Sequence, residues 1–154
     1  MLAAHRPWEA VHRWLVGWLL PLGLLFSASA GAAAELPEAQ AKAVRAVIEA
    51  QLEAFAADDA ERAFSYASPS IHEMFGTAPQ FMAMVQGRYS MLVKPESVVF
   101  LLPSSVRGSV IQEVLIRDGD GRLWRAAYRL EPIADGSWRI NACVVAPDDG
   151  KSST

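Results

Sequence analysis

The side chains best suited to acid–base chemistry in this chain are one histidine and two tyrosines. His72 is the only histidine after residue 34, and Glu73 follows it directly. A histidine oriented by a carboxylate can act as a general base, with the hydroxyl of Tyr66 or Tyr89 as its partner. Neighbouring residues of a helix point about 100° apart, however, so His72 and Glu73 do not face one another. We expect His72 to be exposed or to cap a helix, and Tyr66, His72 and Tyr89 are weak candidates for catalysis.

Nucleophilic catalysis by a serine finds little support in the sequence. Such a site would have to combine His72 with Ser65, Ser68 or Ser70. Their spacing does not resemble the turn that exposes a nucleophilic serine in known hydrolases.

A copper(I) site is a second reading of the same region. Met74, Met82, Met84 and Met91 lie near His72, and thioether sulfurs suit that ion. Met82 and Met84, however, are two residues apart and point to nearly opposite sides of a helix. We expect the methionines to fill the core or a pocket, and we expect no metal and no cofactor.

Aromatic side chains are the better candidates for ligand recognition. An aromatic ring with one polar end suits small ligands, and it suits an ordinary core equally well. The candidate ligand-binding residues are Tyr66, Met84, Tyr89, Trp124, Tyr128 and Trp138.

The chain begins with a segment typical of a secretory signal peptide. A basic start is followed by an apolar run at residues 14–26 and by small residues at 27–34. The apolar run is shorter than the roughly 20 residues that a membrane-spanning helix needs. We expect residues 1–34 to be removed, which predicts a periplasmic or secreted protein. The alternative is an uncleaved segment, which would be the chain's only contact with a membrane.

Composition excludes several classes of partner and cross-link. The net charge is −3 and no cluster of lysine and arginine stands out, so we expect no nucleic-acid binding. Cys143 is the only cysteine, so no disulfide can form within the chain. Its apolar neighbours predict a small buried side chain in a strand.

The first half of the remaining chain has helical periodicity. Apolar residues recur at helical spacing between residues 37 and 57, at Val44, Val47, Ile48, Leu52 and Phe55. Three further helix starts with capping side chains follow at residues 58–61, 68–70 and 77–80. We expect Asp58 and Asp59 to serve as caps rather than as paired catalytic carboxylates.

The second half has the pattern of strands. Four strands are expected, at residues 97–102, 109–117, 122–130 and 138–145. Glycine-containing turns at 118–121 and 135–136 join strands as hairpins. The sequence therefore predicts an α+β fold, with N-terminal helices packed on one face of a four-stranded antiparallel sheet. We expect residues 147–154 to form a polar, flexible tail.

Alternation along the strands predicts which side chains share a face. In the third strand one face carries Trp124, Ala126, Tyr128 and Leu130. In the last strand Trp138, Ile140, Ala142 and Val144 oppose Arg139, Asn141, Cys143 and Val145. The inward faces are mostly apolar, with Glu113 and Asn141 as the polar candidates.

Motifs along the chain resemble a known family. Asp135-Gly136-Ser137-Trp138-Arg139-Ile140 looks like the last strand of the nuclear-transport-factor-2-like (cystatin-like) superfamily. A closer resemblance, over residues 38–146, is to a bacterial domain-of-unknown-function family, number 4864. It rests on residues 58–59, 63–64, 66–71, 74–76, 81–85, 89, 121–124, 128–130 and 138–144. The superfamily resemblance implies a curved sheet and a cone-shaped pocket in a domain at residues 35–146. Fold alone does not choose among catalysis, small-molecule binding and partner docking.

Three functions remain open at this point. The preferred one is a non-enzymatic exported domain that binds a small amphipathic molecule or a protein partner. The second is an isomerase- or hydratase-like enzyme in the cone pocket, which requires a buried titratable group with a perturbed pKa. The third is a module that forms a homodimer through the open face of the sheet, where Arg125 and Arg129 alternate with small residues.

Overall fold

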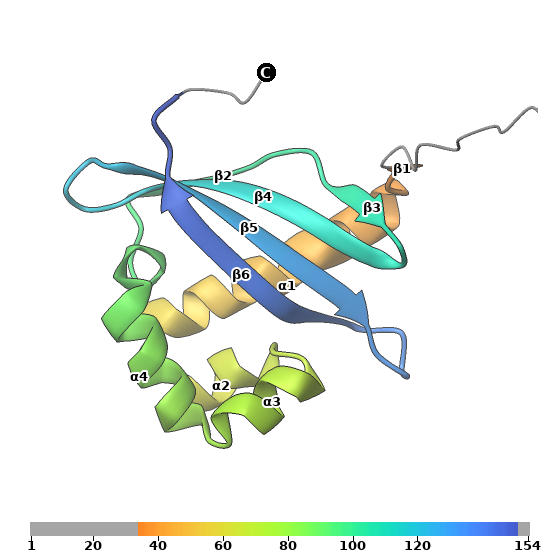
Figure 1. Cartoon of the computed structure of the whole chain (residues 1–154), viewed down its shortest axis with the longest axis horizontal. Coiled ribbons are helices and arrows are strands. Elements are labelled where there is room, and N and C mark those ends of the chain that lie inside the picture. The colour runs from red at the N-terminus through yellow and green to blue at the C-terminus, as the bar shows by residue number, and fades with distance from the viewer. Residues whose placement is uncertain (1–33, 151–154) are drawn as a thin grey trace, which may run out of the picture. The chain divides into compact units, whose positions relative to one another are not determined.

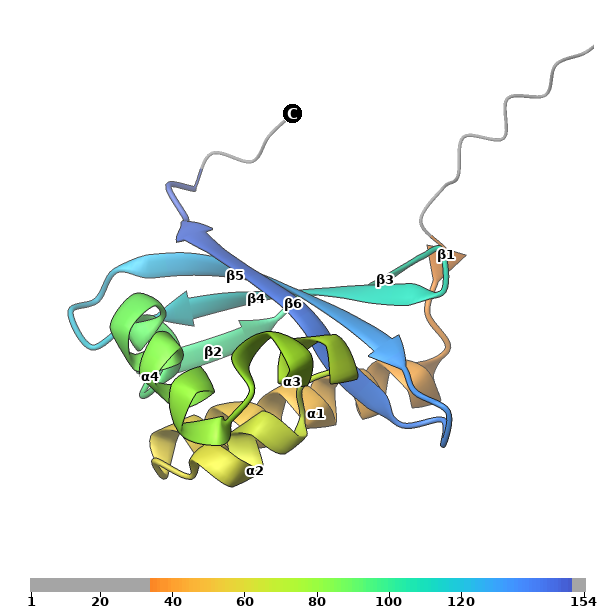
Figure 2. The ribbon, with the colours of Figure 1, turned by 60° about the horizontal axis from the view of Figure 1, so that its bottom comes forward.

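The computed structural model describes residues 34–150, so the expected signal segment lies, except for its last residue, outside the described part. Apart from a two-residue strand at Ala34–Glu35, helices come first and strands follow, as expected for an α+β fold. The helices lie on one face of an antiparallel sheet, and Figures 1 and 2 show this layering from two sides. Within residues 34–150, no helix combines the length and the apolar character needed to cross a membrane.

The long helix α1 (Glu38–Ala56) forms the centre of the helical layer. Val44, Ile48 and Phe55 recur at helical spacing and are buried against the sheet. The sheet contributes buried aliphatic side chains from its central strands, including Val114 and Leu130. This interface is the hydrophobic core of the domain.

Three short helices follow, and their capping residues confirm the expected starts. α2 (Ala60–Ser65) begins after Asp59, α3 (Pro69–Phe75) after Ser68 and α4 (Ala78–Arg88) after Thr77. Each capping oxygen accepts a hydrogen bond from a backbone N–H of the first turn. A short 3-10 helix, η1 (Ser90–Leu92), follows α4.

Asp58 was expected to cap a helix, and this expectation is wrong. Its backbone has φ of 55°, a left-handed conformation that aspartate tolerates better than most residues. Its Oδ1 accepts a hydrogen bond from Nε2 of Gln86 at 2.8 Å. Asp58 therefore ties the turn before α2 to helix α4.

The sheet contains the four expected strands and two short additional ones within residues 34–150. The expected strands are β2 (Ser97–Phe100), β4 (Ser109–Arg117), β5 (Leu123–Pro132) and β6 (Trp138–Pro147). The additional strands are β1 (Ala34–Glu35) and β3 (Ser104–Val106). β2 and β3 pair with different halves of β4 and are separated by Pro103, which lacks the N–H that a continuous ladder needs. The strand count of four is therefore wrong, although the sheet is antiparallel as expected.

A β-bulge in β6 changes which of its side chains face the helices. Arg129 pairs with Ala142 and Leu130 pairs with Ile140, so Asn141 is an extra residue between them. The extra residue reverses the alternation, and Cys143 packs against the core while Val144 is 67% exposed. The expected common face of Trp138, Ile140, Ala142 and Val144 is wrong beyond Ile140 for this reason.

Glu113 was also expected to point inward, and it does not. It lies between buried Gln112 and Val114 on β4, so its side chain faces away from the helices. There its Oε2 lies 3.4 Å from Nη1 of Arg125. Gln112 is the polar residue of β4 that is buried on the helical side.

Candidate ligand-binding pocket

The structure contains a pocket of about 530 Å³ between the helices and the C-terminal strands. Side chains from α1, α3 and α4 form one side, and residues of β5 and β6 form the other. Figure 1 shows the arrangement of these elements. The volume falls within the range of about 300–1,000 Å³ that is usual for small-molecule sites.

The innermost part of the pocket is aromatic. The ring of Phe81 lies 6.1 Å from Phe55, 5.2 Å from Phe64 and 5.5 Å from Phe75, in tilted, stacked and edge-on arrangements. Phe81 and Val85 are four residues apart on α4, so both present their side chains to the same side. The four rings come from four helices, and three of them, Phe55, Phe75 and Phe81, line the pocket.

Tyr128 on β5 contributes the only buried side-chain polar atom without a hydrogen-bond partner in residues 34–150. The residue lines the pocket and is 1% exposed. Its cross-strand neighbour is Cys143, which lines the same wall. The Cys143 thiol lies close enough to the Tyr128 hydroxyl to act as a weak hydrogen-bond partner and raise its pKa, but the contact falls short of full hydrogen-bond geometry. A buried polar group without a partner costs about 1–3 kcal/mol of stability.

Both titratable groups of this wall remain protonated at neutral pH. Burial raises the pKa of the Tyr128 hydroxyl well above its ordinary value, and the neighbouring Cys143 raises it further. Burial also raises the pKa of the Cys143 thiol, from 9.0 to about 12. The thiol group is enclosed, although the residue as a whole retains some exposed surface. A protonated thiol is a poor nucleophile, because the thiolate is the reactive form.

A cluster of three polar side chains, Ser68, Ser70 and Asn141, adjoins the pocket through Asn141, the member that lines it. Oδ1 of Asn141 accepts hydrogen bonds from the hydroxyls of Ser68 at 3.1 Å and Ser70 at 2.8 Å. The two hydroxyls lie 2.9 Å apart, and Ser68 is 0% exposed. The bulge places the Asn141 side chain in this cluster, and Asn141 also lines the pocket.

Backbone hydrogen bonds attach the turn before α3 to the edge of β6. The N–H of Ser68 donates to the carbonyl of Ile140 at 2.8 Å, and the N–H of Ile140 donates to Tyr66 at 2.9 Å. Ala67 forms an isolated parallel bridge with Ile140 between them. The wall of the pocket is therefore fixed to the sheet at this point.

The most exposed side chains of the lining mark its mouth. Met74 of α3 is 71% exposed, and Arg88, the last residue of α4, is also exposed. Arg88 is the only charged residue of the lining, which contains no carboxylate and no imidazole among the described residues. No acidic side chain within residues 34–150 forms an ion pair with Arg88.

Three of the six expected ligand-binding residues line this pocket: Met84, Tyr89 and Tyr128. Tyr66, Trp124 and Trp138 lie outside it. The indole N–H of Trp124 donates to Oδ2 of Asp118 at 2.8 Å in the hairpin turn. This bond is the main reason that the pKa of Asp118 is lowered. Trp124 therefore stabilises the turn.

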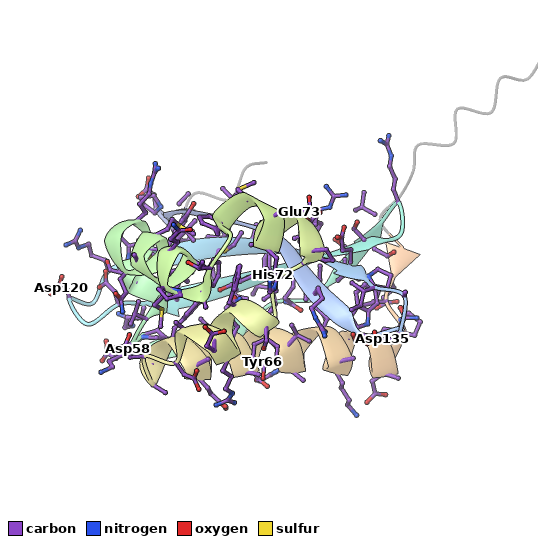
Figure 3. All side chains as sticks on the ribbon, turned by 90° about the horizontal axis from the view of Figure 1, so that it is seen from below. Asp58, Tyr66, His72, Glu73, Asp120 and Asp135 are labelled. Atoms are coloured by element: carbon purple, nitrogen blue, oxygen red, sulfur yellow. The ribbon has the colours of Figure 1, made fainter. Side chains whose placement is uncertain are left out.

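The three candidate catalytic residues are not brought together. Only Tyr89 lines the pocket. His72 was expected to be exposed or to cap a helix, but it is half-buried and stacks on Phe64 at 3.8 Å between ring centroids. Figure 3 shows the His72 and Glu73 side chains on different sides of α3, so the carboxylate does not orient the imidazole.

Sequence reasoning missed several residues of the lining. Arg88 lies four residues after Met84 on the same helix, and this spacing predicts a shared face. Cys143 was assigned to the face opposite Ile140, because the bulge between them has no clear signal in the sequence. Gln51 was not singled out, although it lies among apolar positions of α1, where its Nε2 donates to the carbonyl of Ala63 at 3.1 Å.

The acidic side chains of the described chain are dispersed. No group of three histidine, cysteine, aspartate or glutamate residues within residues 34–150 is arranged to hold a metal ion. Asp120 and Asp135, for example, lie in turns at opposite ends of the molecule (Figure 3).

Comparison with known proteins places the chain in a family. The family model described as domain of unknown function, DUF4864, matches residues 37–153. No curated protein and no solved structure shows significant similarity to the chain. The family match covers nearly the whole described domain and most of the sequence, and the chain therefore belongs to the DUF4864 family.

Proposed function

We propose that this protein binds a small, largely apolar molecule in the pocket beneath α3 and α4. The observation that carries the proposal is the Tyr128 hydroxyl, a buried polar group without a partner in the wall of a pocket of about 530 Å³. In native structures nearly all buried polar groups find a hydrogen-bond partner in the protein or in water. The Tyr128 hydroxyl has almost no accessible surface in this structure, so a ligand with a hydrogen-bonding atom at its inner end would reach it after a small shift of the neighbouring side chains.

The chemistry of the lining supports binding more strongly than proton transfer. An isomerase or hydratase needs a group that can accept a proton near neutral pH. The titratable groups of the inner wall, Tyr128 and Cys143, have raised pKa values and stay protonated. They can donate a hydrogen bond, but they cannot act as a base at neutral pH.

Two features of the sequence support a wider proposal. The N-terminal segment resembles a signal peptide, which would place the binding domain in the periplasm or outside the cell. The motifs shared with the nuclear-transport-factor-2-like superfamily imply a pocket between helices and sheet. We infer that the protein is an exported binding domain of this type.

The proposal can be tested by filling the pocket. Met84 on α4 is half-buried and lines the pocket, so Met84→Trp should occlude it. The control is Ala83→Trp, because Ala83 is the preceding residue of the same helix, is exposed and does not line the pocket. A screen of amphipathic and aromatic compounds by thermal unfolding of the purified protein should identify ligands that raise the transition temperature.

The expected result is that Met84→Trp abolishes the thermal shift and Ala83→Trp leaves it unchanged. The proposal is wrong if no compound stabilises the unmodified protein. It is also wrong if Met84→Trp folds and binds the compounds as well as the unmodified protein does.

A further inference from the structure

We propose that the ligand is an anionic amphiphile of the fatty-carboxylate class, with its charged end paired to Arg88 at the mouth and its apolar chain inside the pocket. This inference rests on the proposed binding function and adds the charge and the orientation of the ligand. It is argued from the lining of the pocket alone.

The charge follows from Arg88. It is the only charged residue of the lining, and no carboxylate lines the pocket to neutralise it. Four other arginines of the described chain form ion pairs with acidic side chains, namely Arg45, Arg62, Arg122 and Arg125. The remaining four, Arg107, Arg117, Arg129 and Arg139, form none but do not line the pocket. Arg88 has no such pair within residues 34–150 and is available to an anion from solution. A guanidinium group matches the geometry of a carboxylate with two parallel hydrogen bonds.

The orientation follows from the interior of the pocket. Its inner surface is formed by Phe55, Phe81 and Tyr128, which are buried and uncharged. A carboxylate placed there would lose its hydration without gaining a cationic partner, which is strongly unfavourable. The anionic end therefore stays at the mouth and the apolar chain enters.

The inner end of the ligand meets Tyr128. Its hydroxyl is uncharged and lacks a full hydrogen bond within residues 34–150, so, once neighbouring side chains shift to expose it, it suits a neutral acceptor such as a carbonyl oxygen. A carboxylate with a keto group near the far end of its chain satisfies both Arg88 and Tyr128. We expect it to bind more tightly than the unsubstituted carboxylate of equal length.

Titration calorimetry with the purified protein tests the charge. Straight-chain carboxylates from hexanoate to dodecanoate, below the concentrations at which they form micelles, identify the chain length that fits. At that length the carboxylate should bind more tightly than the alcohol, and the amine should bind most weakly. Arg88→Gln should weaken carboxylate binding about five-fold and leave alcohol binding unchanged. The control is Arg107→Gln, which removes an exposed arginine of the β3–β4 hairpin that does not line the pocket.

A second comparison tests the inner contact. The keto carboxylate should lose its advantage over the unsubstituted carboxylate in Tyr128→Phe and keep it in Tyr66→Phe, because Tyr66 lies outside the pocket. If the keto carboxylate loses its advantage equally in both variants, Tyr128 is not the residue that contacts the inner end of the ligand.

The outcomes separate this inference from the proposed function. If the alcohol binds as tightly as the carboxylate and Arg88→Gln changes neither, the anionic class is wrong and pocket binding stands. If carboxylates, alcohols and amines of every length fail to bind, and the compound screen also finds no ligand, both proposals fall. Tighter binding of the carboxylate, with its selective loss in Arg88→Gln, supports the inference.

Discussion

Two sets of polar side chains lie in or beside the same pocket, and their surroundings differ. In the cluster of Ser68, Ser70 and Asn141, both hydroxyls can donate to Oδ1 of Asn141, and the two hydroxyls also lie within hydrogen-bond distance of each other. The Tyr128 hydroxyl on the neighbouring strand has no such partner within the described chain. The cluster connects the turn before α3 to the bulge of β6, whereas the Tyr128 hydroxyl connects no two elements by a hydrogen bond.

This difference separates a structural role from a functional one. A satisfied polar cluster offsets its own desolvation and fixes one geometry of the pocket wall. An unsatisfied hydroxyl lowers stability, and phenylalanine would fill the same space without that cost. We therefore interpret the cluster as part of the scaffold and Tyr128 as part of the binding surface.

Among single substitutions at neutral pH, breaking the cluster should produce the largest effect. Ser68→Ala removes the cap of α3 and a buried hydrogen bond to Asn141, so we expect a loss of about 2 kcal/mol in the free energy of unfolding. Urea unfolding measures this change. Ser65→Ala is the control, because its exposed hydroxyl donates only to the carbonyl of Arg62, and it should change stability by less than about 0.5 kcal/mol. Equal losses in the two variants would show that the cluster has no special structural role.

Alkaline pH should lower the free energy of unfolding through Cys143, the neighbour of Tyr128 in the pocket wall. The ordinary pKa of the Cys143 thiol is 9.0 and its pKa in the folded protein is about 12. Between these values the unfolded chain releases the proton and the folded chain keeps it. The unfolded state then binds fewer protons, so stability falls as pH rises, by about 1.4 kcal/mol per pH unit.

The measurement is the free energy of unfolding at a series of pH values from below 9.0 to about 12. Cys143→Ala should show a shallower decline over this range, with no difference in slope at lower pH. Tyr128 also titrates above its ordinary pKa of 10.0, and Cys143 raises the pKa of Tyr128, so the difference in slope isolates the thiol between pH 9.0 and 10.0. Identical slopes would mean that the thiol is not enclosed in the folded protein.

The scaffold was more predictable from the sequence than the site. The caps at Asp59, Ser68 and Thr77 depend only on residues next to them in the chain, so the local sequence pattern was sufficient to predict them. The four longer strands were found because alternation and glycine turns are also local signals. Strand β3 was missed because it is only three residues long and its pairing depends on β4.

The site depends on contacts between residues far apart in the sequence. Asn141 is bulged where it meets Ser68 and Ser70, which are 73 and 71 residues away. Strict alternation could not reveal this bulge, so Cys143 was placed on the face opposite Ile140, whereas both residues pack against the core. Tyr128 was recognised as a candidate because alternation held in β5, but its lack of a partner is a property of the folded packing.

Tyr128→Phe should have the smallest effect on stability and the opposite sign to Ser68→Ala. Removing a buried hydroxyl that lacks a partner should stabilise the ligand-free protein by about 1 kcal/mol, which corresponds to a rise of about 4 °C in Tm. Tyr66→Phe, at a half-buried tyrosine outside the pocket, should bring no comparable gain. Thermal unfolding of the three proteins without ligand measures both.

The sign of this change decides the interpretation of the pocket. A residue that lowers the stability of the ligand-free protein is retained because of its role in the ligand-bound protein. A gain of stability in Tyr128→Phe would support such a role for Tyr128. A loss of stability would mean that the hydroxyl has a partner in solution. Tyr128 would then resemble the cluster of Ser68, Ser70 and Asn141, and the main argument for a bound ligand would fail.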